Sequence, residues 1–261
     1  MSIKRIFIDH PISDICSLDR ENTNYIKNVL RHRAGDQVIV FDGMKEALGV
    51  YDGKSSITIT KMLRENVAEP VLKLAIAHIK QARFEWLVEK ATEIGVSEIF
   101  LLDTKFSQNK IRNLERVRKI AIEAARQCNR VTIPKIHEAI KLDIFIERYK
   151  NEAWAFGAIE GKDVCLNEDS SQLGNKYANV HQTYLNRKNS FLSGINRSAS
   201  LLDHNQNIDE KIIGIVIGPE GGFEENESKK LINHFRAISL SHNILRAETA
   251  ALIGLIYIFF D

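Results

Sequence analysis

The sequence has few of the features that mark secreted, fibrous or membrane proteins. Its three cysteines, Cys16, Cys128 and Cys165, lie far apart without a Cys-x-x-Cys pair, which argues against a disulfide framework and a zinc site. Only four prolines and fourteen glycines occur among 261 residues, which excludes collagen-like and wholly disordered chains. The longest apolar run, 250–260, has eleven residues, whereas a membrane-spanning helix needs about 20. We therefore expect a globular protein with reduced thiols, no metal and no membrane segment.

The N-terminal residues lack the apolar core of a secretory signal, because Lys4, Arg5 and Asp9 already interrupt them. This pattern predicts a cytoplasmic protein. The eight histidines show no metal-ligand spacing, so His78, His137 and His181 are predicted to be structural or surface residues. The net charge of +2 indicates little about partners until it is divided along the chain.

Residues 1–70 predict a small β-rich domain. Strand-like runs at 5–8, 37–41 and 56–60 are separated by turn signals that contain Gly35, Gly43 and Gly53. The ten basic and ten acidic residues of this part cancel, so no broadly cationic surface is expected. The segment 66–70 then separates it from the rest of the chain.

From Val71 onwards, strands and helices alternate, which predicts an α/β domain over 71–261 with a mainly parallel sheet covered by helices on both faces. Strands are expected at 72–77, 98–102, 153–158, 212–217 and 237–240. Helices are expected at 83–94, at 226–235 and at the C-terminus. A further amphipathic helix is expected with one apolar face formed by Leu114, Val117, Ala121, Ala124 and Cys128. Residues 161–210 hold eight Asn and six Ser without a sustained period, which favours a flexible surface insertion over a recognition loop.

Two segments near the C-terminus are candidates for chemistry. Ile217-Gly-Pro-Glu-Gly-Gly-Phe223 lies at the end of an apolar strand, where glycines let a ligand approach the backbone. A tight turn into the helix at Asn226 explains the same pattern equally well. At the start of the last helix, Glu248 or Thr249 suits the N-terminal turn. Arg246 opposes the helix dipole there, which suggests an anionic partner or a specific carboxylate.

A third candidate is electrostatic. The stretch from Lys105 to Lys135 contains nine basic residues and only two acidic ones, Glu115 and Glu123, which gives a local net charge of +7. Such a stretch is typical of a phosphate-binding surface, although a solvated helix face is the alternative.

These segments together resemble the bacterial ribosomal RNA small subunit methyltransferase E family of the SPOUT superfamily. The matching motifs are Arg5-Ile-Phe, Val29-Leu-Arg-His-Arg-Ala-Gly-Asp36, Phe41-Asp-Gly43, Glu89-Lys-Ala-Thr-Glu-Ile-Gly-Val96, Gln127 to Pro134, the glycine-rich segment and Ile244-Leu-Arg-Ala-Glu-Thr-Ala250. The resemblance implies an N-terminal PUA-like β-barrel that helps to bind RNA and a C-terminal SPOUT α/β domain tied in a deep trefoil knot. It also implies a homodimer that uses S-adenosyl-L-methionine to methylate N3 of a uridine in small-subunit (16S) ribosomal RNA.

The resemblance further assigns site residues. The cofactor is expected against Ile217, Gly218, Pro219, Glu220, Gly221, Gly222, Leu240, Leu245 and Arg246, and RNA against Arg5, Arg126, Gln127 and Arg130. Arg246 and Glu248 are the expected catalytic residues: Arg246 stabilises negative charge on the base, and Glu248 acts as a base or holds Arg246.

The chain also departs from the family pattern. Ser241-His242-Asn243 stands where the family usually has a glycine, a variable residue and an arginine. Two alternative functions are an RNA-binding ribosome assembly factor with impaired catalysis and a ribose 2′-O-methyltransferase of the same superfamily.

Overall fold

The computed structural model describes residues 3–65, 70–107, 110–111, 113–158, 211–241 and 243–259. The insertion predicted at 161–210 lies outside the described residues. The chain forms two compact units. The first contains 1–73, 81–99 and 111–138, and the second contains 74–80, 100–110 and 139–261.

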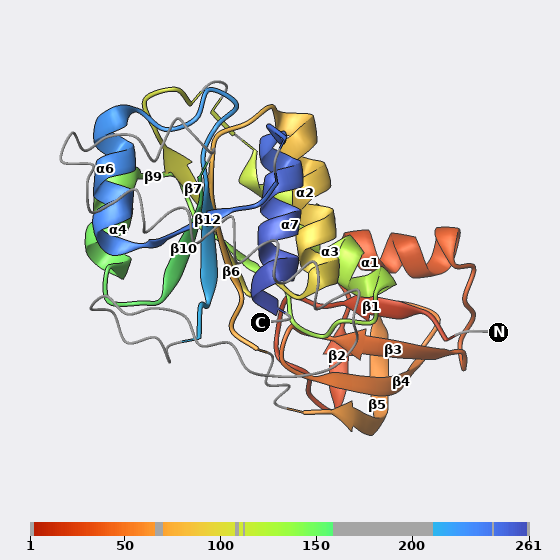
Figure 1. The fold of residues 1–261 in the computed structure, drawn as a ribbon. Coiled ribbons are helices and arrows are strands. Elements are labelled where there is room, and N and C mark those ends of the chain that lie inside the picture. Colours follow the sequence, from red (N-terminus) through yellow and green to blue (C-terminus); the bar gives the residue numbers. More distant parts are fainter. Residues whose placement is uncertain are drawn as a thin grey trace, which may run out of the picture. The chain divides into compact units, whose positions relative to one another are not determined.

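The first unit contains a five-stranded sheet, in the order β1-β3-β4-β5-β2 (Figure 1). β1 pairs in parallel with β3, and the other neighbours are antiparallel. Within the described residues the edge strands β1 and β2 do not pair with each other, so the expected barrel is a half-barrel sheet. The strands are β1 (Arg5–Phe7), β2 (Ile15–Ser17), β3 (Gln37–Phe41), β4 (Glu46–Tyr51) and β5 (Ser56–Arg64).

Tight turns set the register of this sheet. Gly43 and Gly53 adopt φ values of 94° and 80°, a region that favours glycine. At the second turn, Asp52 accepts hydrogen bonds from the backbone N–H groups of Ser56 and Lys54, which lower the pKa of its carboxyl group to about 2. The predicted turn signals at Gly43 and Gly53 therefore correspond to the β3–β4 and β4–β5 hairpins, whereas the one at Gly35 precedes β3.

Helices α1 (Arg20–Asn24), α2 (Gln81–Ile94) and α3 (Leu114–Gln127) also belong to the first unit, together with a π-helical turn, η1 (Tyr25–Val29). α2 and α3 pack against each other. On α3, Val117, Ala121, Ala124 and Ala125 are buried, so the predicted amphipathic face is present but includes Ala125 in place of the exposed Cys128. Asn113 caps this helix by accepting a hydrogen bond from the backbone N–H of Arg116.

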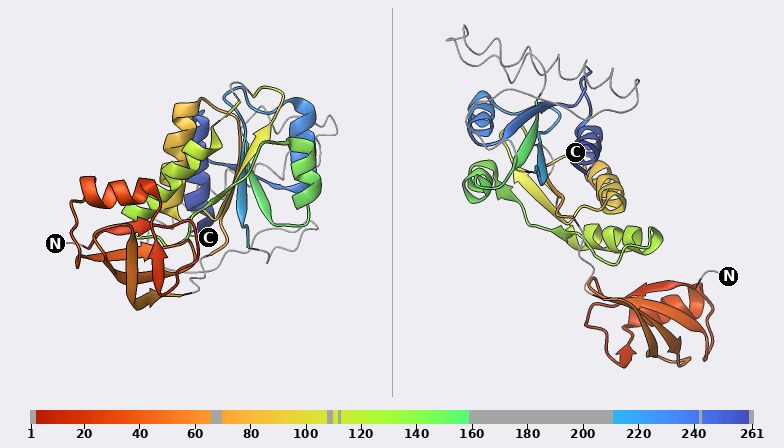
Figure 2. Two further views of the ribbon diagram at one scale, coloured as in Figure 1. Left: turned by 180° about the vertical axis from the view of Figure 1, so that it is seen from behind. Right: turned by 60° about the horizontal axis from the view of Figure 1, so that its bottom comes forward.

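The second unit is built on a sheet whose strands run in the order β12-β10-β11-β6-β7. Helices α4 and α6 lie on one face and α7 on the other, as both views show (Figures 1 and 2). The pairs β10–β11 and β10–β12 are parallel, as are the pairings of β7 with β8 and β9. The elements are β6 (Lys73–Ala77), β7 (Glu98–Asp103), β9 (Ile140–Lys141), α4 (Leu142–Tyr149), β10 (Trp154–Ala158), β11 (Gly214–Ile217), α6 (Glu225–His234), β12 (Arg236–Ser239) and α7 (Ala247–Phe259). The short strand β8 (Lys135–Ile136) pairs with the first residues of β7, and both belong to the first unit.

An aromatic cluster forms the core between this sheet and α4 and α6. Phe145 packs edge-on against Phe100 and Trp154, at ring-centroid distances of 5.4 and 5.0 Å. Gly214 faces the Trp154 ring, and a Cβ atom there would lie 2.5 Å from it. The α/β architecture with a parallel sheet, predicted from the alternation of elements, is confirmed.

Candidate functional site at the carboxyl ends of the strands

The glycine-rich segment forms a turn at the end of β11. The N–H of Gly222 donates to the carbonyl of Pro219 at 2.9 Å, and Gly222 has a φ of 76° that a residue with a side chain adopts only with strain. Gly218 lies against the ring of Phe223, which a Cβ atom would approach to 3.1 Å. Phe223 is part of the aromatic core. The turn is therefore anchored on one side by the core.

The carboxyl end of β7 meets the same turn. A Cβ atom on Gly221 would lie 3.3 Å from the Cβ of Phe106, which follows β7. The N–H of Lys105 donates to the Glu227 carboxylate at 2.9 Å, and its ammonium group pairs with Glu224. The loops after β7 and β11 thus share one edge of the sheet.

Three parallel strands end side by side at this edge. Gly157 near the end of β10 is in register with Ile238 of β12. A Cβ atom on Gly157 would lie 3.1 Å from Cδ1 of Ile217 and 3.2 Å from Cδ1 of Leu240. The structure thus brings together Ile217 and Leu240, which are 23 positions apart in the sequence. Gly157 was not singled out from the sequence, although a glycine inside a strand often marks close approach of another group.

The other predicted site residues lie around the start of α7. Leu245 is half-buried and Arg246 is exposed, while Glu248 in the first turn of the helix is only 7% exposed. The carbonyl of Arg246 accepts the N–H of Ala250 at 2.9 Å, which begins the helical hydrogen-bond pattern. Two of the three residues that depart from the family pattern are hydrogen-bonded to each other, because the backbone N–H of Asn243 donates to the Ser241 hydroxyl. The third, His242, lies outside the described residues.

A buried histidine lies at the carboxyl ends of β6 and β7. Nε2 of His78 lies 3.1 Å from the Asp103 carboxylate, and Lys110 lies 3.7 Å from the same oxygen. Burial lowers the pKa of His78, while Asp103 opposes this shift. The imidazole is therefore neutral near pH 7.

The expected RNA-contacting residues have internal partners. Arg5 is 7% exposed: Nε donates to Glu46, Nη1 to the carbonyls of Ala125 and Arg126, and Nη2 to that of Arg130. Arg130 is 8% exposed and donates to the carbonyls of Thr92 and Gly95. These contacts hold the end of α3 in place.

The two remaining candidates lie at the end of α3. Arg126 pairs with Glu123, and its guanidinium lies 4.3 Å from the ring centroid of Tyr25. Gln127 is exposed and donates to Glu123. Both therefore remain nearer to solvent than Arg5 and Arg130.

Most cations of the predicted basic stretch are paired with carboxylates. Along α3, Arg116 pairs with Glu85, Arg118 with Asp9 and Lys119 with Glu21, at 2.7 to 2.8 Å. In the second unit, Lys105 and Lys110 also have acidic partners. Arg112 lies outside the described residues. The local balance of +7 is thus largely compensated by carboxylates from other parts of the chain.

The described residues contain no group of three or more His, Cys, Asp or Glu side chains suited to a metal ion. Among these same parts of the chain, no helix is long and apolar enough to cross a membrane.

Comparison with known proteins places the chain in a family. A model of the RNA methyltransferase domain matches residues 67–258, and a model of the RNA methyltransferase PUA domain matches residues 18–60. The ribosomal RNA small subunit methyltransferase E of Synechocystis sp. is 30% identical over 92% of this chain and 71% of its own length. The chain belongs to the ribosomal RNA small subunit methyltransferase E family.

Other members of this family are similar over nearly their whole length. The protein of Rickettsia conorii is 28% identical, and the match covers 97% of this chain and 93% of the relative. The fold agrees with that of the family member from Neisseria gonorrhoeae, solved with S-adenosyl methionine, at a TM-score of 0.69 and 20% identity over 98% and 96% of the two chains. A methyltransferase of Legionella pneumophila, solved with the cofactor SAM, gives a TM-score of 0.69 at 24% identity over 99% and 97%.

Proposed function

We propose that this protein is an S-adenosylmethionine-dependent methyltransferase that acts on N3 of a uridine in small-subunit ribosomal RNA. The observation that carries the proposal is the glycine-lined edge formed by Gly157, Gly218 and the turn at 219–222, in a chain of this family. Gly157 and Gly218 let Ile217, Leu240 and Phe223 pack closely against the strand ends. At Gly222 nothing lies within 4 Å of the place that a Cβ atom would take, so the backbone of the turn is open to a flat ligand there. Ile217 and Leu240 supply apolar cover at the same place.

The residues present fit the proposed cofactor. Backbone groups of the turn at 219–222 suit an adenine edge, and Leu240 and Leu245 suit its faces. The cofactor supplies an activated methyl group on a sulfonium centre. The chain itself must orient the base and favour loss of the proton on N3.

Arg246, with Glu248 as a positioning residue, would stabilise the negative charge that develops on the base. Uridine N3 is a poor nucleophile while protonated; transfer of its proton to solvent water would spread negative charge over O2 and O4 until the methyl group bonds to N3. The exposed guanidinium of Arg246, at the start of α7, is suited to bind this charge. Glu248 is buried beneath the same helix turn, which supports a positioning role more than direct contact with the base.

The family resemblance extends the proposal to a deep trefoil knot in the second unit, a cytoplasmic location and a homodimer. The dimer is supported by α7, where Ile253, Ile256 and Phe259 recur every three residues and are 36%, 46% and 40% exposed. An exposed apolar stripe on one helix is typical of an interface.

Calorimetric titration with S-adenosylmethionine tests the cofactor site. We expect the wild-type protein to bind and Gly157→Val to lose binding, because the valine side chain would displace Ile217 and Leu240, the apolar cover of the proposed site. Failure of the wild-type protein to bind the cofactor would refute the cofactor assignment.

Methyl transfer is tested by incubation with undermethylated small ribosomal subunits, followed by mass spectrometry of the nucleosides. The wild-type protein should produce 3-methyluridine. Arg246→Ala should abolish this product without changing the fold. Arg236→Ala, which removes another exposed arginine, on β12, should retain it. A folded protein that binds RNA, but neither binds the cofactor nor transfers a methyl group, would instead be an assembly factor. Methylation of a ribose would favour the 2′-O-methyltransferase.

A further inference from the structure

Two sets of cations in the first unit, those of α3 and those of the α1–η1 segment, differ in their pairing. Those on α3 pair with carboxylates, as described above. Exposed cations of α1, η1 and the loop after η1 form no ion pair with any described carboxylate; these are Arg20, Lys27, Arg31 and Arg33. A cation without an ion pair can bind an external anion without first breaking a bond to a carboxylate of its own chain. The α1–η1 segment is therefore a better candidate for phosphate contacts than α3.

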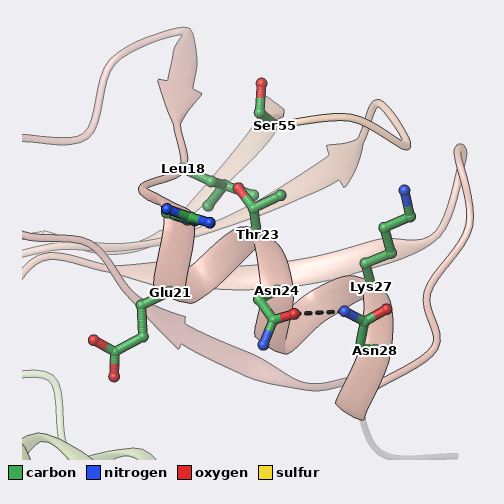
Figure 3. A pocket seen from close by; sticks show the side chains of 8 residues that line it. Leu18, Glu21, Thr23, Asn24, Lys27, Asn28 and Ser55 are labelled. Atoms are coloured by element: carbon green, nitrogen blue, oxygen red, sulfur yellow. Dashed lines mark hydrogen bonds between the residues drawn. The ribbon is translucent and has the colours of Figure 1, made fainter.

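An open pocket of about 850 Å³ lies on this segment (Figure 3). Its polar lining combines the two cations Arg20 and Lys27 with hydrogen-bonding groups from Thr23, Asn24, Asn28 and Ser55. Such amide and hydroxyl groups bind phosphate oxygens and ribose hydroxyls in RNA complexes.

The acidic groups of the segment are engaged elsewhere. Glu21 also lines the pocket, but its carboxylate binds Lys119 of α3 at 2.7 Å and points away from the other labelled side chains in Figure 3. Asp19 caps α1 by accepting the N–H of Asn22 at 2.6 Å. The pocket therefore presents net positive charge.

The backbone of this segment is unusual as well. α1 continues directly into the π-helical turn η1, and Arg31, two residues after it, has a φ of 56°. π-helical turns and left-handed residues other than glycine are energetically costly and occur often at functional sites. The buried side chain of Ile26 anchors the turn in the core, so Lys27 and Asn28 project outward.

We infer that the α1–η1 pocket binds the phosphodiester backbone of the RNA substrate, with Arg20 and Lys27 as its phosphate contacts. This inference rests on the proposed function, which supplies the RNA. Another pocket of this unit, about 480 Å³ in volume, is less suited to an anion because its three carboxylates, Asp9, Asp42 and Glu115, outnumber its cations, Arg118 and Lys135. The open shape and distributed polar groups of the α1–η1 pocket suit an extended backbone.

The test compares two double variants with equal loss of charge. Arg20→Gln with Lys27→Gln alters the pocket, and Lys4→Gln with Lys61→Gln is the matched control, because both lysines are exposed residues of the same unit. Dissociation constants for purified small ribosomal subunits are measured from about 50 to about 200 mM salt. We expect the pocket variant to bind at least about tenfold more weakly, with a salt slope lower by about 2.

The control variant should retain nearly the wild-type affinity and slope. Wild-type behaviour of the pocket variant, equal losses in both variants, or no RNA binding by the wild-type protein would each overturn the inference. Cofactor titration and 3-methyluridine formation by the wild-type protein are measured separately. Failure of these two activities alone would refute the proposed function, while the salt slopes would still test the pocket.

Discussion

Arg5 provides a sharp test of how the first unit is held together. Its guanidinium forms a buried ion pair with Glu46 at 2.7 Å and donates to three carbonyls at the end of α3 and just after it. The guanidinium also lies 4.4 Å from the ring centroid of Phe41. In this environment the arginine links β1, β4 and α3, and we expect Arg5→Ala to destabilise the whole unit.

The magnitude follows from what the truncation leaves behind. Removal of one partner from a buried ion pair typically costs about 3–5 kcal/mol, because the other charge remains buried. Glu46 keeps a second partner, Arg64, at 2.7 Å, which places the expected loss near the lower end, at about 3 kcal/mol. The side chain of Arg64 is 41% exposed, so Arg64→Ala, the matched control, should cost only about 1 kcal/mol.

Urea unfolding of the two variants at neutral pH measures these differences. A loss below about 1 kcal/mol for Arg5→Ala would refute the reasoning and return Arg5 to the list of RNA contacts. The pH dependence gives a second check. Burial opposes ionisation of Glu46, but hydrogen bonds from Arg64 and Arg5 outweigh it and hold the pKa of Glu46 below its ordinary value. The stabilisation should therefore be present above about pH 4.3 and be lost as the pH falls further, through the folded-state pKa.

Three further predictions concern other parts of the chain. Arg31→Gly should raise stability by about 1 kcal/mol, because glycine tolerates the φ of 56°, while it weakens RNA binding; Arg33→Gly, without a positive φ, should not stabilise, and thermal unfolding compares the two. Gly214→Ala should cost about 1–3 kcal/mol in urea unfolding, since its Cβ would lie 2.5 Å from the Trp154 ring; unchanged stability would contradict that contact. Burial and the nearby Lys110 lower the pKa of His78 against the opposing effect of Asp103, so the unfolded chain takes up this proton first and stability should fall as the pH drops below about 6.5, the ordinary pKa of histidine. His78→Gln should reduce that fall, and an identical pH profile would show that the imidazole is not responsible.

Local patterns in the sequence were sufficient to predict much of the second unit. The apolar run before Gly218 ends in β11, and the glycines after it form the turn at the carboxyl edge. The contacts that complete this edge could not be predicted locally. Gly157 meets Leu240 only because β10 and β12 are neighbours in the sheet, and no spacing along the chain encodes that pairing.

Short elements were also missed from the sequence. β2, β4 and α4 contain too few residues, or too irregular an alternation, to give a clear period. β4 includes a register shift between Leu48 and Gly49, where a Cβ atom would lie 2.4 Å from Ile57. A glycine required by such close packing looks in the sequence like an ordinary strand breaker.

The distribution of charge shows most clearly why a linear count is insufficient. Residues 1–70 are neutral by composition, but the fold separates their charges: Asp9, Glu21 and Glu46 bind cations from α3, β1 and β5. Each carboxylate engaged in this way no longer compensates the cations near it in sequence. Residues 1–70, although neutral by composition, therefore carry the unpaired cations of α1 and η1. The cations of the strongly basic stretch around α3 instead form ion pairs within the protein. Clustered charge in a sequence indicates where cations are, and only the positions of their carboxylate partners indicate which of them remain available to RNA.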